Sequence, residues 1–359
     1  MQDISENSKI NIAIVGCGRI AKRHLGILTD SLADNFRVVG VCDINKTKAT
    51  NKGSFYNVPA YFDLDEMLTQ TRLDVLVILT ESGNHAKNII TASEYALKYI
   101  IVEKPLALSL TEARFAIERC HEAGIKLKLI KQNRLNLPVT KLYEAVQKNW
   151  LGKLNLGTIR VRWKRDTSYY DEAEWRGTWA LDGGALTNQA SHHVDLLISI
   201  MGKVDSVFAY TSTKLVEIEA EDTAIAILKF KSGAHGVIEV TTAARPVDLE
   251  GSISILGTKG TVEVGGFAVN KILTWKFTDE VSVPPVTESY NENPANVYGF
   301  GHQKYYENFI KEFAGEDTFV TDAIEGLPSL ELIHAIYESA ETGKEVKLSG
   351  YYPNSKLGK

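Results

Sequence analysis

The sequence has few of the features that would place a protein outside the cell or in a membrane. Its 359 residues include only 3 cysteines, too few and too odd in number for a disulfide framework, which favours a reducing cytoplasm. The strongest apolar run, residues 75–79, is far too short to span a bilayer, and the polar, acidic start is unlike a signal peptide. We therefore expect a cytoplasmic protein without a membrane partner.

Neither sign of charge dominates the chain. The net charge of −5 gives no global basic field, so the composition argues against a nucleic-acid partner. An anionic substrate would therefore need local lysines or arginines. No Cys or His spacing resembles a metal site, so no metal is expected. The length exceeds that of one typical domain, and we expect two domains, each with its own core.

The first third of the chain alternates short apolar runs with amphipathic stretches. The expected strands cover residues 10–15, 38–42, 74–79, 99–102 and 126–131. Helices are expected at residues 19–29 and 84–97, and after Ser109, which forms a capping-box pattern with Glu112. Continuous Val/Ile/Leu strands between helices indicate a doubly wound parallel sheet of the Rossmann type. We assign this α/β domain to residues 1–132.

From residue 133 the pattern changes to long alternating strands joined by turns. A bridging segment at residues 133–150 carries a helix at 139–149. The expected strands then cover residues 157–164, 204–213, 223–230, 235–241, 251–256 and 261–264, before helices at 297–313 and 323–342. Turn-linked strands predict an α+β domain, residues 133–359, with a large open, mostly antiparallel sheet. Because an open apolar sheet face usually seeks a partner, we expect a homo-oligomer, either a dimer or a tetramer.

A G-x-G-x-x-A motif lies between the first strand and the first helix. Gly16 permits the tight turn, Gly18 leaves room for a pyrophosphate, and Ala21 allows close helix packing. Asp43 ends the second strand, about 20 residues further on, where a carboxylate binds the ribose hydroxyls and repels a 2′-phosphate. The motif therefore predicts NAD rather than NADP. Two alternatives are a flavodoxin-like fold without a dinucleotide, and an Asp43 that merely caps the next helix.

A second candidate element closes the strand at residues 99–102. Glu103, Lys104 and Pro105 follow this strand at the carboxyl edge of the sheet, where open α/β sheets bind their ligands. The Lys104 ammonium could hydrogen-bond a reacting hydroxyl and stabilise developing negative charge. The alternative is a solvated lysine at the end of a strand.

A third candidate element follows Gly183 and Gly184. If it is one helix, Asn188, His192 and Asp195 share a face at i, i+4 and i+7. A neutral His192 can accept a hydroxyl proton as hydride leaves the carbon, while Asn188 positions the imidazole or binds a sugar hydroxyl. Asp195 could hold the other ring nitrogen. The alternative is a buried core histidine with Asp195 as its partner.

Together these three elements resemble the Gfo/Idh/MocA oxidoreductase family over nearly the whole chain. The resemblance implies that Lys104 and His192 handle the substrate hydroxyl, and that Thr80 and His85 line the nicotinamide end. Many members carry Asp at the position of Asn188, and an amide cannot act as a base, so the proton role falls more heavily on His192. The implied cofactor-binding residues are Gly16, Gly18, Arg19, Ile20, Ala21, Asp43, Thr80, His85, Glu103, Lys104 and Gln132.

Residues 131–136, 175–179, 188–189 and 298–306 look like the WlbA/WbpB group within this family. Members of that group oxidise the 3″-hydroxyl of UDP-N-acetylglucosaminuronic acid with NAD, for surface polysaccharides such as O-antigen, and some recycle NADH with 2-oxoglutarate. The implied substrate contacts are Lys104, Lys131, Asn133, Arg134, Trp175, Arg176, Asn188 and His192.

Cations and aromatic side chains suit such a substrate. Arginine can bind a uronate through two parallel hydrogen bonds, Lys164 and Arg165 are further cationic candidates, and Trp175 could stack on a sugar or a base. Two other functions stay open. One is a dehydrogenase of a free sugar or inositol, and the other is an NAD-binding sensor that has lost the chemistry.

Overall fold

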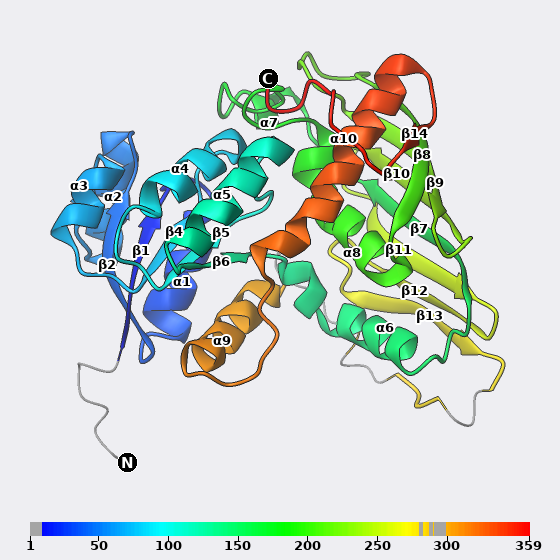
Figure 1. Ribbon diagram of the computed structural model, residues 1–359, viewed down its shortest axis with the longest axis horizontal. Coiled ribbons are helices and arrows are strands. Elements are labelled where there is room, and N and C mark those ends of the chain that lie inside the picture. The colour runs from blue at the N-terminus through cyan, green and yellow to red at the C-terminus, as the bar shows by residue number, and fades with distance from the viewer. Residues whose placement is uncertain (1–8, 280–282, 287–289, 291–298) are drawn as a thin grey trace. The chain divides into compact units, whose positions relative to one another are not determined.

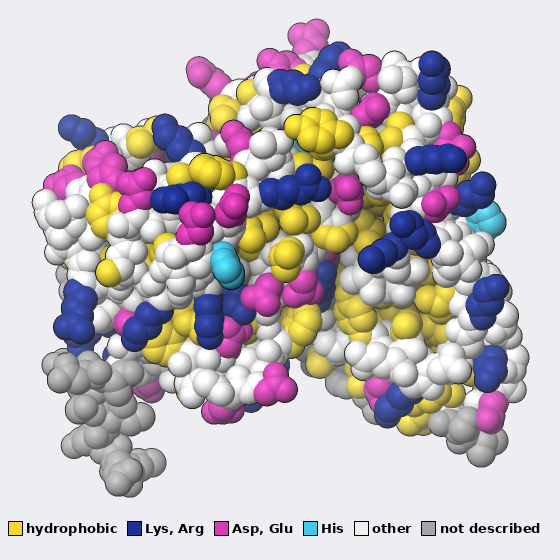
Figure 2. Space-filling view, in the orientation of Figure 1, with side chains coloured by type: hydrophobic (Ala, Val, Ile, Leu, Met, Phe, Trp, Pro, Cys, Tyr) yellow, Lys and Arg dark blue, Asp and Glu magenta, His cyan; other side chains and the backbone are white. Residues whose placement is uncertain are grey.

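The computed structural model describes residues 9–279, 283–286, 290 and 299–359 (Figure 1). The chain falls into two compact units. The first unit consists of the chain up to Ile130 together with His302–Leu327. The second unit consists of Lys131–Gly301 and Pro328–Lys359. Among the described residues, no helix has the length and apolarity needed to cross a membrane. Charged side chains of both signs are interspersed on the face shown in Figure 2.

The first unit contains a six-stranded parallel sheet in the order β3-β2-β1-β4-β5-β6. Its strands are β1 (Ile10–Val15), β2 (Phe36–Cys42), β3 (Ala60–Tyr61), β4 (Val75–Ile78), β5 (Tyr99–Val102) and β6 (Lys126–Leu129). All residues of β4 and β5 are buried, as a sheet covered on both faces requires. The strand order reverses between β1 and β4, which is the switch point where such sheets bind ligands. The expected Rossmann sheet is confirmed, and the two-residue edge strand β3 was too short to show a pattern.

Short helices connect these strands. They are α1 (Ala21–Gly26) with a π-helical turn at Ile27–Ser31, α2 (Lys46–Tyr56), α3 (Leu64–Gln70), a 3-10 turn at Ser82–Asn84, α4 (His85–Ala92) and α5 (Leu110–Glu122). Ser109 caps α5 as expected, because its Oγ accepts the Glu112 N–H at 3.4 Å. The α4 helix ends earlier than residue 97, and the Ser93 hydroxyl there donates back to the Ile90 carbonyl. Helices α4 and α5 pack side by side (Figure 1).

Helix α9 (Gly301–Phe313) joins the first unit although it follows the second unit's strands in the sequence. Phe309 is fully buried, and its ring lies 6.5 Å from Phe36 and 5.0 Å from Tyr99. We expected a single boundary at residue 132, but aromatic packing brings this later segment back to the parallel sheet. The expected start of α9 at Val297 lies outside the described residues.

The second unit contains an eight-stranded sheet in the order β13-β12-β11-β7-β10-β9-β8-β14. Its strands are β7 (Leu154–Arg162), β8 (Val204–Ser212), β9 (Thr223–Phe230), β10 (His235–Thr241), β11 (Glu250–Gly257), β12 (Gly260–Gly265), β13 (Lys271–Phe277) and β14 (Val346–Lys347). The β7–β10 pair is parallel and the other pairs are antiparallel. The expected open, mostly antiparallel sheet is confirmed, with β13 and β14 as additional edge strands.

The helices of this unit lie before, between and after the strands. They are a 3-10 turn at Gln132–Leu135, α6 (Leu137–Gln147), α7 (Thr167–Tyr170), a π-helical turn at Ala185–Gln189, α8 (Ser191–Met201) and α10 (Leu327–Thr342), which follows the 3-10 turn Ala323–Gly326. Helix α8 packs on β7 and β11. It approaches closely, because a Cβ at Gly157 would meet Leu197 and Met201 at 2.8 Å. The fold thus fixes α8, which carries His192, on one face of the sheet.

Candidate active site

The glycine turn after β1 fits a dinucleotide. Gly16 has a φ of +96°, and a Cβ there would lie 2.5 Å from the Leu79 carbonyl carbon, so only glycine is accommodated. A Cβ at Gly18 would meet nothing within 4 Å, so the space beside it is open to a phosphate. Ala21 is fully buried where α1 begins, which allows the close packing that the motif requires.

Asp43 lies directly after β2, beside this turn. One carboxylate oxygen accepts the Cys17 N–H at 2.8 Å, and the other accepts the Asn45 N–H at 2.8 Å. Helix α2 is capped by Asn45, whose side chain accepts from Lys48, so the alternative that Asp43 caps this helix is wrong. The turn and the carboxylate together fit the pyrophosphate and ribose of NAD.

Replacing Asp43 by Ser is expected to weaken NADH binding about 10-fold or more, since a charged acceptor for the ribose diol is lost. The preference for NADH over NADPH should fall at least as much, because the repulsion of a 2′-phosphate disappears. Fluorescence titration with both cofactors measures this. Asp34→Ser, at an exposed position of the same unit, is the control. Unchanged selectivity in Asp43→Ser would remove the assigned role.

Thr80 and His85 form a brace between the ends of β4 and β5. His85 is buried, with Nδ1 at 2.6 Å from the Pro105 carbonyl oxygen and Nε2 at 3.0 Å from the Thr80 carbonyl oxygen. Burial lowers the pKa of His85, although the two carbonyls oppose this shift. The Thr80 hydroxyl accepts from Asn88 at 3.0 Å. This brace fixes Pro105, the residue after Lys104.

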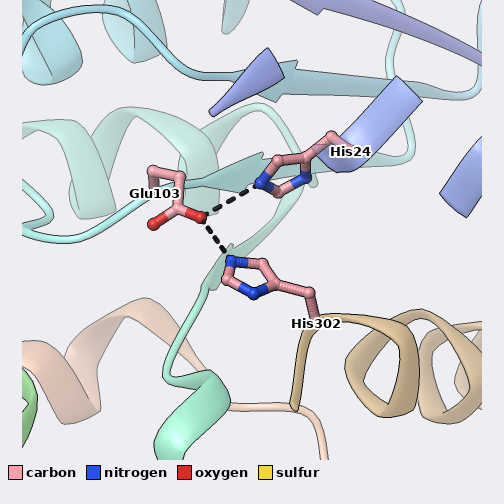
Figure 3. A group of neighbouring side chains, drawn as sticks. All are labelled: His24, Glu103 and His302. Atoms are coloured by element: carbon pink, nitrogen blue, oxygen red, sulfur yellow. Dashed lines mark hydrogen bonds and ion pairs between the residues drawn. The ribbon is translucent and has the colours of Figure 1, made fainter. Parts of the chain in front are cut away.

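Lys104 lies at the carboxyl end of β5, half-buried, on the edge where the cofactor is expected. The side chain of Glu103 points to a different environment. Its Oε1 accepts from His24 at 3.1 Å and from His302 at 3.0 Å, and its Oε2 accepts the Lys104 N–H at 3.1 Å (Figure 3). We expected Glu103 to contact the cofactor, whereas the structure places its carboxylate in a buried cluster of the protein's own donors.

The sequence reasoning missed both histidines of this cluster. His24 lies on α1, just after the glycine turn, and His302 lies at the start of α9. Among the described residues, these two and Glu103 are the group whose ligand atoms could surround a metal ion, since they lie within 4.8 Å of one another. Their N–O separations are also ordinary hydrogen-bond lengths. The sequence did contain one signal for this cluster, because His24 lies one turn into the helix that follows the glycine motif.

The Asn188–His192–Asp195 face differs from the expected continuous helix. Asn188 lies in the π-helical turn Ala185–Gln189, and α8 begins only at Ser191, so the i, i+4, i+7 spacing is wrong. Glu221 holds the start of this turn, since its carbonyl oxygen accepts the Ala185 N–H at 2.8 Å and its carboxylate accepts the Leu186 N–H at 2.7 Å. The turn itself closes through the Ala190 N–H, which donates to the Ala185 carbonyl five residues earlier at 3.0 Å.

The three side chains consequently have separate environments. The Asn188 amide donates to Asp182, and its oxygen accepts from Gln189 at 3.0 Å. His192 is 8% exposed on α8. Asp195 accepts two hydrogen bonds from the Arg134 guanidinium, at 2.8 and 2.9 Å, and lies 3.4 Å from the Lys131 ammonium.

The charges of Lys131 and Arg134, two of the cations expected to bind the substrate, are neutralised by Asp195 inside the second unit. Lys131, Arg134 and Asp195 are each less than 10% exposed, and burial, which by itself raises the pKa of Asp195, is outweighed by the two cations. Their pairing favours a role in holding α8 over direct contact with a free anion. Gln132 and Asn133, between the two cations, are buried as well.

Arg176 and Trp175 lie near a second group of aromatic and charged side chains. The Arg176 guanidinium lies 4.1 Å from the Tyr169 ring centre and pairs with Glu172 at 2.8 Å, and Trp175 is half-buried beside it. Arg165 lies 5.4 Å from the same ring and donates to Gln189 at 3.1 Å. The structure thus brings Arg165 next to the Asn188–Gln189 pair, while Lys164 forms an exposed pair with Asp166.

A hollow of about 610 Å³ lies beside Arg176 and is open to solvent. Its acidic lining residues are Asp171, Glu174, Glu217 and Glu219. Arg176 is the cation among its lining residues.

Glu221 should make the stability of this region depend on pH. Burial raises its pKa from 4.5 to about 7, and Asp182 adds to the shift. The unfolded chain loses this proton at lower pH than the folded chain, so stability is lost as pH rises from about 4.5 to about 7.

We therefore expect Glu221→Gln to be stabilised relative to wild type by about 2 kcal/mol at pH 8, and to lose this gain at pH 5. The amide oxygen keeps an acceptor for Leu186 and Tyr337 without a buried charge. Thermal unfolding at the two pH values measures the difference. An equal gain in stability at pH 8 and pH 5 would contradict the raised pKa assigned to Glu221.

Two family models match the chain. The model for the oxidoreductase family's NAD-binding Rossmann fold matches residues 10–130, and the model for its C-terminal alpha/beta domain matches residues 144–348. Both describe Gfo/Idh/MocA proteins. Together they span most of the sequence and both sheets of the structure.

Solved structures give a more specific similarity. The WlbA dehydrogenase from Chromobacterium violaceum, in complex with NADH and UDP-GlcNAcA, is 42% identical with a TM-score of 0.88, covering 96% of this chain and 97% of that chain. The WlbA dehydrogenase from Bordetella pertussis, in complex with the same ligands, is 40% identical with a TM-score of 0.86, covering 95% and 99%.

A curated relative lies further away. Myo-inositol 2-dehydrogenase from Thermotoga maritima is 26% identical over 97% of this chain and 96% of its own length. Its similarity extends through both units, as the family models do. The chain therefore belongs to the Gfo/Idh/MocA oxidoreductase family, with its NAD-binding Rossmann domain, and is an NAD-dependent dehydrogenase.

Proposed function

We propose that the protein oxidises the 3″-hydroxyl of UDP-N-acetylglucosaminuronic acid to the 3-keto sugar, in the synthesis of surface polysaccharide sugars. One observation carries the proposal. Identity to the two WlbA dehydrogenases, solved with NADH and UDP-GlcNAcA, is 40% and 42% along nearly the whole chain, against 26% to the inositol dehydrogenase. The chain as a whole is thus more similar to the nucleotide-sugar enzymes.

The glycine turn and Asp43 would hold the cofactor. Gly16 and Gly18 leave the pyrophosphate room, backbone N–H groups at Arg19 and Ile20 face it, and Asp43 binds the ribose hydroxyls. When bound, NAD accepts the hydride from the sugar carbon. We assign Thr80, His85 and Gln132 to the surroundings of the nicotinamide.

The hydroxyl proton is handled by two residues in this proposal. Lys104 donates a hydrogen bond to the hydroxyl oxygen and stabilises the negative charge that develops on it. His192 accepts the proton through its imidazole. Asn188, held by Asp182 and Gln189, positions the sugar, since an amide cannot take the proton.

Substrate affinity is assigned to the second unit's polar residues. The proposed direct contacts are Asn133, Trp175, Arg176, Lys104, Asn188 and His192, and Lys131 and Arg134 are proposed to support the substrate site. Because Asp195 already pairs with Lys131 and Arg134, these two act on the substrate chiefly by fixing α8. Arg165, beside Gln189, is the further cation that suits a carboxylate.

Substrate-dependent formation of NADH tests the reaction. The kcat/KM for UDP-N-acetylglucosaminuronic acid should exceed that for myo-inositol, glucose and UDP-N-acetylglucosamine by at least about 1,000-fold, since only the first carries the uronate. Comparable rates with myo-inositol or glucose would favour a free-sugar dehydrogenase. NADH binding without turnover of any of them would favour a sensor. If NADH stays bound after turnover, addition of 2-oxoglutarate should restore the reaction.

Exposed apolar side chains on β8 and β9 suggest how the protein forms an oligomer. Ile225 and Ile227 on β9 are 50% and 58% exposed and lie opposite Tyr210 and Phe208 on β8. A continuous apolar surface of this kind is typical of a subunit interface, and we propose that a second copy of the chain covers it.

Ile227→Lys is therefore expected to shift the protein from a dimer or tetramer towards the monomer. A charge placed in an apolar interface costs several kcal/mol of association free energy, on the order of a buried unpaired ion. Light scattering after size-exclusion chromatography measures the mass. Phe115→Lys, at an exposed apolar position on α5, is the control. A wild-type monomer would contradict the proposal.

A cytoplasmic location is part of the same proposal. Cys17, Cys42 and Cys120 are all buried and free. Burial raises the pKa of each thiol to about 12, which keeps them protonated and unreactive. Such cysteines suit a reducing compartment.

A further inference from the structure

We infer that His24, His302 and Tyr306 are positioning residues for the proposed reaction, and that they hold Lys104 in place through the carboxylate of Glu103. The inference rests on the role proposed for Lys104. It assigns a function to a buried cluster of titratable groups that takes no part in the chemistry described above.

Three segments far apart in the sequence meet at Glu103 (Figure 3). His24 comes from α1, Glu103 follows β5, and His302 comes from α9. Both imidazoles reach the same carboxylate oxygen through Nε2, at 3.1 and 3.0 Å. The other carboxylate oxygen accepts the Lys104 N–H at 3.1 Å. The cluster therefore connects the helix after the glycine turn to the backbone of Lys104.

The proton positions follow from burial. Burial and the neighbouring Glu103 raise the pKa of Tyr306 well above its ordinary value, so its hydroxyl keeps its proton. This hydroxyl lies 2.7 Å from His24 Nδ1. On the other side of the ring, Nε2 carries a proton and donates to Glu103, because an ionised carboxylate can only accept.

His302 donates to the same carboxylate through Nε2. Burial lowers its pKa, the hydrogen bond to Glu103 opposes this, and the charges of His24 and Arg23 lower it further. Burial alone would raise the pKa of Glu103, but the two imidazole hydrogen bonds outweigh it and hold the value well below the usual range. The result is an ionised carboxylate held by two imidazole N–H donors, and these hydrogen bonds account for the cluster without a metal ion.

Lys104 is anchored on both sides as a consequence. On one side, Glu103 is held by the two imidazoles and by its own N–H, which donates to the Ile78 carbonyl at 3.0 Å. On the other side, the Pro105 carbonyl oxygen lies 2.6 Å from His85 Nδ1. Because a misplacement of about 1 Å in a catalytic group can cost roughly 100-fold in rate, this anchoring bears on turnover.

Two substitutions of His302 separate positioning from packing. In His302→Leu the donor to Glu103 is lost, and we expect kcat to fall about 10-fold or more while Kd for NADH stays within about threefold. In His302→Gln an amide N–H can donate from nearly the same place, and most of kcat should return. A His302→Leu enzyme that folds and keeps the wild-type kcat would overturn the inference, as would a His302→Gln enzyme no better than His302→Leu.

A measurement without substrate keeps the inference testable if His302→Leu fails to fold. In ¹⁵N-histidine NMR spectra of the wild-type protein at pH 8, the Nε2 atoms of His24 and His302 should both carry a proton, because each faces the Glu103 carboxylate. Tyr306→Phe should change the His24 signals by removing the hydroxyl beside Nδ1. An Nε2 without a proton in either ring, or His24 signals unchanged in Tyr306→Phe, would overturn the inference. Wild-type protein that is inactive on the UDP-uronate would refute the proposed function. The NMR measurement, which needs no substrate, would still test the hydrogen bonds of the cluster.

Discussion

Lys104→Met is expected to lower kcat by at least about 100-fold, because the donor that stabilises charge on the reacting oxygen is lost. NADH binding should stay within about threefold of wild type, since the glycine turn and Asp43 are unchanged. Steady-state NADH formation and fluorescence titration measure the two quantities. Lys87→Met, at an exposed position on α4, is the matched control. Wild-type turnover in Lys104→Met would show that Lys104 does not stabilise charge on the reacting oxygen.

His192→Ala should show a loss of similar size, about 100-fold or more, because the proton acceptor is missing. If both side chains act on one hydroxyl, their effects should not add. The double variant should then be little slower than the slower single variant. Losses that multiply would show that Lys104 and His192 act on separate steps.

Asp195→Asn should destabilise the protein by about 3 kcal/mol or more, because removing one partner of a buried ion pair leaves an uncompensated charge. Here two cations, Lys131 and Arg134, would keep their charges at 3% and 8% exposure. Urea unfolding measures the change. The control is Glu122→Ala in the exposed Arg119–Glu122 pair, where less than about 1 kcal/mol is expected. A similarly small effect in Asp195→Asn would show that the cluster does not hold α8.

The parallel sheet could be predicted closely because its signals are local. Short apolar runs define β1 and β5 with the expected bounds. The bounds of β9 and β10 also match, and burial alternates along both strands. The glycine motif likewise depends on residues next to one another in the chain. Boundaries of the parallel unit could not be predicted, since aromatic packing of α9 against Phe36 and Tyr99 is a tertiary contact.

The site could be predicted in part, for the same reason. Gly16, Gly18 and Asp43 occupy the positions that their spacing indicated. Asn188 lies in a π-helical turn whose first N–H groups are bound by Glu221, more than 30 residues later. Asp195 binds Arg134, 61 residues earlier, and Glu103 binds His302, 199 residues later. Polar groups choose partners by proximity in the fold, which local sequence does not contain.

The position of hydride removal is the central claim, and isotope transfer tests it most directly. The protein would be incubated with NAD and UDP-N-acetylglucosaminuronic acid deuterated at C3″, and the reduced cofactor analysed by mass spectrometry. Our account predicts NADH that carries the deuterium, formed beside a 3-keto sugar. Unlabelled NADH, with the deuterium kept on the sugar, would contradict oxidation at this hydroxyl.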